Sequence, residues 1–273
     1  MKLIFLDIDG TLTEPGSNTP PESALKAIRR TQANGNKVFL CSGRNYSMLK
    51  PLLRYGFDGI VASAGGYVTI GNEVIYDHPM PEEDVTKALD VLHRNGVFCT
   101  VEARDATYGD ENIGDFLATA GGNNSEIERW RKALSETLDI RPMKEYAGEP
   151  VYKIVIMCLK AEQLDEARQL LEQDYEFCIQ EVREHGSCQN GELINRAFDK
   201  GRGILKIAEK LNVPIEDVYG FGDSMNDLTM IQTCGTGVCM ANGAEALKQV
   251  SDLVVPSVQE DGLYMGFIQL GLI

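Results

Sequence analysis

Short apolar runs alternate with amphipathic stretches near both ends of this chain. The apolar runs end at turn residues and are rich in Val, Ile, Leu and Phe, which predicts strands buried on both faces of a parallel sheet. They lie at 3–6, 37–41, 60–63, 217–220 and 237–240. Apolar residues at helical spacing predict helices between them. These helices are expected at 20–34, 45–55, 200–211 and from Glu260 onward. Strands and helices in alternation predict an α/β fold.

The middle of the chain has a different pattern, in which the strands are amphipathic rather than uniformly apolar. Its expected strands are 97–103, 151–159 and 175–180, and its expected helices are 81–95, 126–138 (with Trp130) and 161–172. Segment 105–124 is rich in Gly, Asp and Asn and is expected to be irregular, apart from a short helix near Phe116. This pattern predicts a smaller α+β domain with an antiparallel sheet. A hairpin across Gly71-Asn72, with strands at 67–70 and 74–77, precedes it.

The spacing of three polar residues next to predicted strands and helices, Asp9, Ser42 and Lys200, indicates where this domain is inserted. Asp9 and Ser42 are 33 residues apart, about one β-α-β unit, whereas Ser42 and Lys200 are 158 residues apart. The second interval has room for a whole domain. We therefore predict a doubly wound, Rossmann-like parallel sheet core with an inserted α+β cap domain. The expected boundaries are 1–79 plus 189–273 for the core and 80–188 for the cap.

Composition and charge argue against a membrane protein, a disulfide-rich protein and a protein that binds nucleic acid. The 273 residues are 43% hydrophobic and 25% charged, which is ordinary for a globular protein. No run approaches the roughly 18 apolar residues of a membrane helix, and no signal peptide is expected before the first strand. Seven cysteines without a paired spacing favour reduced thiols and a cytoplasmic location. A net charge of −15 argues against nucleic acid as a partner, since phosphate backbones bind clustered Lys and Arg.

Two carboxylates follow the first strand, in the sequence DIDGT. Asp7 and Asp9 stand where a parallel strand ends, and ligands bind at that edge of open α/β sheets. Asp-Gly alone would indicate only a turn. A carboxylate pair at this edge can also hold a divalent cation, and one member can act as a nucleophile while the other transfers protons.

Three further polar motifs also follow predicted strands or open helices. Ser42-Gly43-Arg44 could hold an anion through the Ser42 hydroxyl and backbone amides, or Ser42 could simply cap a helix. Lys200 opens a helix, where a lone Lys is often just solvated. Segment 222–227, GDSMND, is the most specific signal after DIDGT, and Asn242 follows the strand at 237–240.

Together these motifs resemble those of the haloacid dehalogenase superfamily. DIDGT resembles its DxDGT motif, SGR its second motif, Lys200 after an extended Glu-Leu-Ile its third, and GDSMND its fourth. Met240 to Gly243 is similar to the family's Met-x-Asn-Ala. A cap inserted between the second and third motifs is typical of the Cof-type, sugar-phosphatase-like branch, and this resemblance covers the whole chain. The branch usually carries Asn-Gly before the hairpin, where this chain has Ala64-Gly65-Gly66.

The resemblance implies a Mg²⁺-dependent phosphatase acting on a small phosphate monoester, most commonly a sugar phosphate. Asp7 would be the nucleophile and Asp9 the general acid and base, while Ser42 and Lys200 would hold the phosphoryl oxygens. Further phosphate or substrate contacts are expected from Gly43, Arg44, Asn226 and Asn242. The expected metal ligands are Asp7, Asp9 through its backbone carbonyl, Asp223 and Asp227.

Two alternatives stay open at this level. A phosphomutase would share every core motif, and a binding or regulatory protein could use the same scaffold without catalysis. The expected partner is a small phosphorylated metabolite, with no nucleic acid or membrane, and the chain is expected to be a monomer or small homo-oligomer. Candidate cap residues for substrate choice are Arg104, Lys153, Arg183 and His185.

Overall fold

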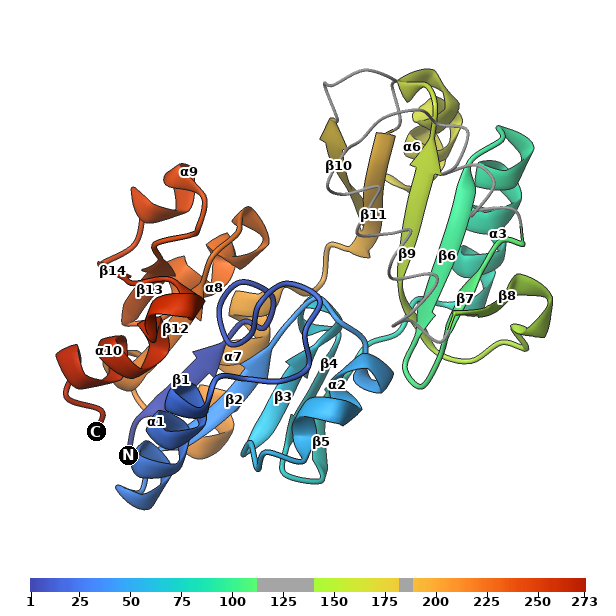
Figure 1. Cartoon of the computed structure of the whole chain (residues 1–273). Coiled ribbons are helices and arrows are strands. Elements are labelled where there is room, and N and C mark those ends of the chain that lie inside the picture. Colours follow the sequence, from blue (N-terminus) through green and yellow to red (C-terminus); the bar gives the residue numbers. More distant parts are fainter. Residues whose placement is uncertain (112–139, 182–188) are drawn as a thin grey trace. The chain divides into compact units, whose positions relative to one another are not determined.

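The computed structural model describes residues 1–111, 140–181 and 189–273, and these form two compact units. The first unit combines Met1–Asp77 with Phe198–Ile273, and the second comprises His78–Ala197. Each unit has its own sheet (Figure 1). Each also has its own apolar core.

The first unit is built on an eight-stranded sheet with the order β14-β13-β12-β1-β2-β3-β4-β5. The parallel strands are β1 (Leu3–Leu6), β2 (Lys37–Cys41), β3 (Gly59–Ala62), β12 (Val218–Gly222), β13 (Thr236–Met240) and β14 (Leu253–Val255). The hairpin of β4 (Tyr67–Ile70) and β5 (Glu73–Asp77) adds two antiparallel strands at one edge. The parallel strands have the doubly wound order, whose direction of winding reverses between β1 and β12.

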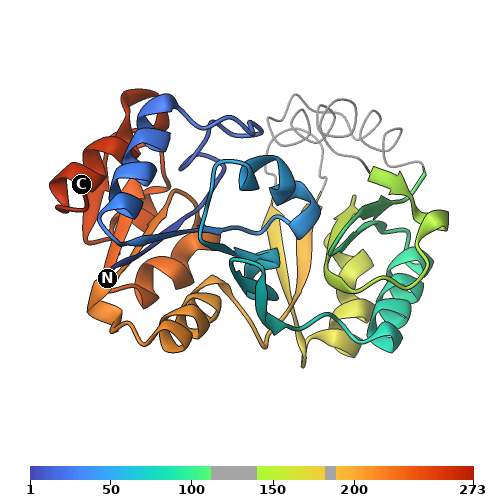
Figure 2. The ribbon, with the colours of Figure 1, turned by 90° about the horizontal axis from the view of Figure 1, so that it is seen from below.

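Helices cover both faces of this sheet. They are α1 (Glu22–Ala33), α2 (Tyr46–Leu53), α7 (Lys200–Leu211), α8 (Leu228–Thr233), α9 (Glu245–Lys248) and α10 (Gly262–Gln269). Phe5 of β1 shares one buried cluster with Ile204 of α7, whereas the Phe221 ring of β12 lies 5.3 Å from Phe267 of α10. In Figure 2 the blue α1 and red α10 accordingly lie on one side of the sheet and the orange α7 on the other. Because successive strand residues face opposite ways, β1 buries side chains under both helical layers.

The second unit has a six-stranded sheet with the order β10-β11-β9-β6-β7-β8. Its strands are β6 (Phe98–Ala103), β7 (Thr107–Gly109), β8 (Ile140–Pro142), β9 (Val151–Cys158), β10 (Tyr175–Glu181) and β11 (Gln189–Asn195). All described pairs are antiparallel except β7 with β8. Helices α3 (Glu82–Arg94) and α6 (Asp165–Leu171) pack on one face, where Ala88 and Ala167 share a core with Ile154.

The second predicted boundary, at residue 189, differs from the division that the structure shows. Strand β11 pairs with β9 and β10, so that Leu193 faces both Ile154 and Phe177, and Leu193 is fully buried in the core of the second unit. The chain passes into the first unit only at Phe198. The Glu-Leu-Ile segment before Lys200 is extended as expected, but its hydrogen bonds belong to the sheet of the second unit.

Several elements of the second unit also differ from the sequence expectation. Residues 107–109 form β7 inside the segment that was expected to be irregular, and β8 was not predicted. Both strands have only three residues, too few for a periodic pattern. The predicted helix at 161–172 begins as a 3₁₀ turn, Ala161–Leu164, before α6. The helix expected at 126–138, Trp130, and the short helix near Phe116 lie outside the described residues.

A buried charge cluster crosses the sheet of the second unit. Lys153 of β9 has its Nζ 2.7 Å from Glu192 Oε1 and 3.3 Å from Glu102 Oε2. Burial lowers the pKa of Lys153, but the two carboxylates outweigh it and hold that pKa above its ordinary value. Burial is also the main cause that raises the pKa of Glu102. Lys153, which the sequence suggested as a cap residue for substrate choice, is therefore held by ion pairs within its own sheet.

We expect Lys153→Met to lower the free energy of unfolding by about 3 kcal/mol, because removing Lys153 leaves the buried carboxylate of Glu102 uncompensated. Urea denaturation followed by circular dichroism measures this change. The matched control is Lys144→Met, whose pair with Glu111 is exposed and should contribute little. Equal stability of the two variants would contradict a structural role for the Lys153 cluster.

Candidate active site

The candidate site lies where β1 and β12 end, at the point where the winding of the sheet reverses. Asp7 follows β1 directly, and its backbone N–H donates to Phe221 O of β12 at 2.9 Å. Asp223 follows β12. This is the edge at which open α/β sheets bind their ligands. Neighbouring parallel strands thus place two carboxylates that are far apart in sequence at one position.

Lys200 links these carboxylates from the first residue of α7. Its Nζ donates to Asp7 Oδ1 at 2.7 Å and to Asp227 Oδ1 at 2.5 Å. The Asp199 side chain caps α7 by accepting from the Arg202 N–H at 2.8 Å, which fixes where the helix starts. The Lys200 side chain is 1% exposed, so its charge faces these carboxylates rather than solvent. Burial lowers its pKa, but Asp227 and Asp7 outweigh that effect and keep Lys200 charged.

The loop after β12 holds Asp223 and Asp227 in place. Asp227 Oδ2 accepts the backbone N–H groups of Asp223 and Ser224 at 3.0 and 3.1 Å, and Thr11 Oγ1 donates to Asp223 Oδ1 at 3.4 Å. Gly10 has a φ of +85°, and a Cβ built there would lie 2.4 Å from Asp223 Oδ2. Glycine is therefore required at this position for the DIDGT loop to approach Asp223.

Negative charge exceeds positive charge in this cluster. Oxygens of Asp7, Asp223 and Asp227 all lie within 4.8 Å of one another, and Lys200 pairs with the first and the last of these residues. Burial and then the charge of Asp227 raise the pKa of Asp7 to about 8, although Lys200 opposes this. Burial and Asp227 likewise raise the pKa of Asp223 to about 6. A divalent cation would compensate these carboxylates, and an all-oxygen donor set is the kind that Mg²⁺ prefers.

Asp9 and Arg44 form a second group beside this cluster. Arg44 Nε and Nη2 donate to the two oxygens of Asp9 at 2.9 and 2.7 Å. Burial is the main cause that raises the pKa of Asp223, and the charge of Asp9 adds to it. Ser42 is buried, and its hydroxyl accepts the Arg44 N–H at 3.2 Å.

The remaining predicted residues have structural contacts at the same edge. Asn226 Oδ1 lies 3.5 Å from Lys200 Nζ, and Asn242 Nδ2 donates to Gly10 O at 2.8 Å. Gly43 lies between Ser42 and Arg44 in the chain. Sequence reasoning missed Thr11 as a partner of Asp223, although it is part of the DIDGT motif. It also missed Asn18, whose contact with Arg44 has no local sequence signal.

Among its described residues, the second unit has two other features that could suggest a site. His93, Cys99 and Asp110 have potential metal ligands within 4.8 Å of one another. However, Asp110 Oδ2 is already engaged by His93 Nε2 and by the Cys99 N–H, and burial raises the pKa of the Cys99 thiol, which opposes thiolate formation. These contacts indicate a structural ion pair.

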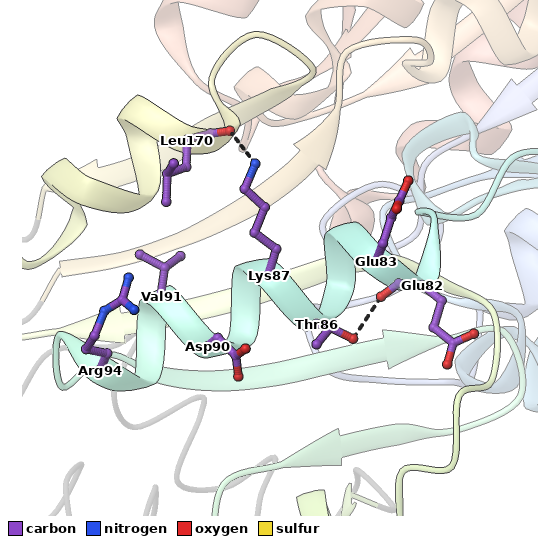
Figure 3. Close-up of a pocket in the computed structure, with 8 residues that line it drawn as sticks. All are labelled: Glu82, Glu83, Thr86, Lys87, Asp90, Val91, Arg94 and Leu170. Carbon is purple, nitrogen blue, oxygen red and sulfur yellow. Dashed lines mark hydrogen bonds between the residues drawn. The ribbon is translucent and has the colours of Figure 1, made fainter.

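A surface pocket of the second unit is lined mainly by charged side chains of α3 (Figure 3). Lys87 reaches across it and donates to Leu170 O at 3.3 Å. Its lining residues are Glu82, Glu83, Thr86, Lys87, Asp90, Val91, Arg94 and Leu170. None of the predicted site residues is among them. Of the other cap candidates, Arg104 pairs with the adjacent Asp105, while Arg183 and His185 lie outside the described residues.

Comparison with known proteins places this chain in a family. The sequence model of the haloacid dehalogenase-like hydrolases matches residues 4–267, so the chain belongs to this family. The YkrA protein of Bacillus subtilis is 32% identical over 281 residues, covering 100% of this chain and 98% of its own. The 5-amino-6-(5-phospho-D-ribitylamino)uracil phosphatase YwtE of Bacillus subtilis is 26% identical, covering 96% of each chain.

A solved structure supports the same assignment. A hypothetical protein from Geobacillus kaustophilus HTA426 superposes with a TM-score of 0.80 at 28% identity, over 100% of this chain and 99% of its own. Because its relatives are named phosphatases, the chain is a hydrolase of the phosphatase kind, with a Rossmann-like core. Within the described parts of the chain, no helix is both long and apolar enough to cross a bilayer.

Proposed function

We propose that this protein is a Mg²⁺-dependent phosphatase that cleaves small phosphate monoesters through an aspartyl-phosphate on Asp7. The observation that carries the proposal is the position of Asp7: buried, at the end of β1, bonded to Lys200 and grouped with Asp223 and Asp227. Lys200 binds Oδ1 of Asp7 and leaves Oδ2 as the oxygen that attacks phosphorus. Covalent capture divides one difficult hydrolysis into two easier displacements.

Each neighbouring residue then has a defined task. Asp9 protonates the leaving alkoxide and afterwards removes a proton from the attacking water. Lys200 and the Ser42 hydroxyl bind phosphoryl oxygens, where negative charge accumulates in the transition state. The ion would be held by Asp7, Asp223, Asp227 and the backbone carbonyl of Asp9. When bound, it would neutralise phosphoryl charge and orient the phosphate.

The proposed substrate is a phosphorylated sugar or sugar-like alcohol. The name of YwtE describes a substrate with phosphate on a ribityl chain, which is a polyol. An alkoxide leaving group of this kind needs protonation, which suits an acid at Asp9. In this proposal the second unit acts as the cap that selects the leaving group, and the protein works in the cytoplasm.

Phosphate release from a panel of monoesters tests the proposal. Sugar phosphates, a ribityl-type phosphate, pyridoxal phosphate and an aryl phosphate are each incubated with Mg²⁺ and with excess chelator. Release that needs Mg²⁺ and is fastest with a sugar-like phosphate is expected. A phosphomutase would instead return the phosphoryl group to an organic product. Absence of release from every monoester with Mg²⁺ present would contradict a phosphatase.

A further inference from the structure

The Arg44 guanidinium is engaged by protein groups on three of its nitrogens. Its Nε and Nη2 form a bidentate pair with the carboxylate of Asp9, and its Nη1 donates to Asn18 Oδ1 at 2.7 Å. The Nε–Nη2 edge is one of the edges through which a guanidinium binds carboxylates and phosphates in bidentate fashion. A phosphate could use this edge only by displacing Asp9.

The backbone around Arg44 is fixed from both sides. Its N–H donates to Ser42 Oγ at 3.2 Å, and its carbonyl accepts the Ser63 N–H at 2.8 Å. The next residue, Asn45, caps α2 by accepting from the Met48 N–H at 3.0 Å. The Arg44 side chain is only 16% exposed. Arg44 therefore extends from a rigid turn between β2 and α2, as a residue that orients another group should.

Asp9 gains its orientation from these contacts. Its Oδ1 accepts both Arg44 Nη2 and the Gly16 N–H, at 2.7 and 2.8 Å, and its Oδ2 accepts Arg44 Nε. The Asp9 side chain is 36% exposed, so packing alone does not restrict it. Because a carboxyl that transfers protons must be aimed at the leaving oxygen, losing the contacts that orient it reduces turnover rather than phosphate affinity.

We infer that Arg44 is a positioning residue that orients the Asp9 carboxyl, and not a ligand of the substrate phosphate. This inference rests on the proposed function, in which Asp9 transfers protons to the leaving group. The inference gives the two side chains of the Ser42-Gly43-Arg44 motif different roles. Ser42 binds phosphate, whereas Arg44 acts through Asp9.

The test compares Arg44→Gln, Arg44→Lys and the exposed control Arg30→Gln on an alkyl and an aryl phosphate. For Arg44→Gln we expect kcat on the alkyl phosphate to fall about 10- to 100-fold. This loss is smaller than that of the whole general acid, because Asp9 is still present but no longer oriented. The aryl phosphate should lose less, since its leaving group needs less protonation. KM and the inhibition constant of inorganic phosphate should change less than about threefold. Arg44→Lys should recover part of kcat, because it keeps the charge but not the bidentate edge.

A double-mutant cycle with Asp9→Asn completes the test. In the Asp9→Asn background Arg44→Gln should cost little further, because the group through which it acts is already lost. Weaker phosphate inhibition with unchanged kcat, on both substrates and in both backgrounds, would make Arg44 a phosphate ligand and overturn the inference. If the wild-type protein hydrolyses no monoester at all, the proposed function fails and the inference fails with it. Thermal melting of each variant identifies losses that come from unfolding.

Discussion

Asp7→Asn is expected to reduce phosphate release by more than about a thousandfold with Mg²⁺ present. Removing a covalent nucleophile typically costs at least that much, because the remaining groups can only bind and orient the substrate. The fold should persist, since the change removes one of three crowded carboxylates and leaves Lys200 paired with Asp227. Steady-state phosphate release and thermal melting measure the two effects separately.

A half-buried carboxylate elsewhere in the first unit provides the control for this variant. Asp217 precedes β12, and the variant Asp217→Asn should leave turnover unchanged. The covalent step can be detected directly, because rapid acid quenching of the wild-type protein should trap a phosphoryl group whose mass is absent from Asp7→Asn. Retention of more than about a hundredth of wild-type turnover by Asp7→Asn would exclude Asp7 as the nucleophile.

Lys200→Met is expected to affect stability and turnover together. The Lys200 ammonium is the buried partner of both Asp7 and Asp227, so its loss leaves two buried carboxylates without their counter-charge. Breaking such a pair costs about 3–5 kcal/mol of folding free energy. Phosphate release should fall by at least about a hundredfold, since a positive charge on the phosphoryl oxygens is lost. Chemical denaturation in metal-free buffer measures the stability change.

Adding Mg²⁺ distinguishes the charge effect from a packing effect. If the carboxylates are the cause of instability, Mg²⁺ should raise the melting temperature of Lys200→Met, because a ligand that binds only the folded state stabilises it. Turnover should stay low. The control Lys210→Met lies on the same helix, and its pair with Glu73 is exposed. Unchanged stability of Lys200→Met in metal-free buffer would show that Lys200 does not compensate the buried carboxylates.

The architecture of the first unit could be predicted because its signals are local. Strands β1, β2, β3, β12 and β13 are short, mainly apolar runs, and polar motifs follow β1, β2, β12 and β13 at the sheet edge. The short edge strand β14 was not predicted. DIDGT and GDSMND are each complete within a few residues, so their family resemblance required no tertiary information. The family could thus be predicted from these motifs, and the comparisons confirmed it. The roles of the individual residues stay predictions.

Strand β11 shows why the domain boundary could not be predicted. Its residues alternate between buried and partly exposed positions, as Gly191 and Leu193 do beside Glu192, which fits a strand in either sheet. Only the pairing of β11 with β9 and β10 assigns it to the second unit. Strand partners are decided by hydrogen bonds between distant segments, and a local pattern does not record them.

The sequence by itself determined the alternation of strands and helices, the motifs and their order, and hence the class of enzyme. The tertiary structure decided which charged side chains form ion pairs with one another. Lys200 is 193 residues from Asp7 and 27 from Asp227, yet it bonds to both. Arg44, which is 35 residues from Asp9, pairs with its carboxylate, a contact that no local pattern predicts. The physical reason is that ion pairs depend on separations of a few ångströms, which are set when the sheet brings the ends of its strands together.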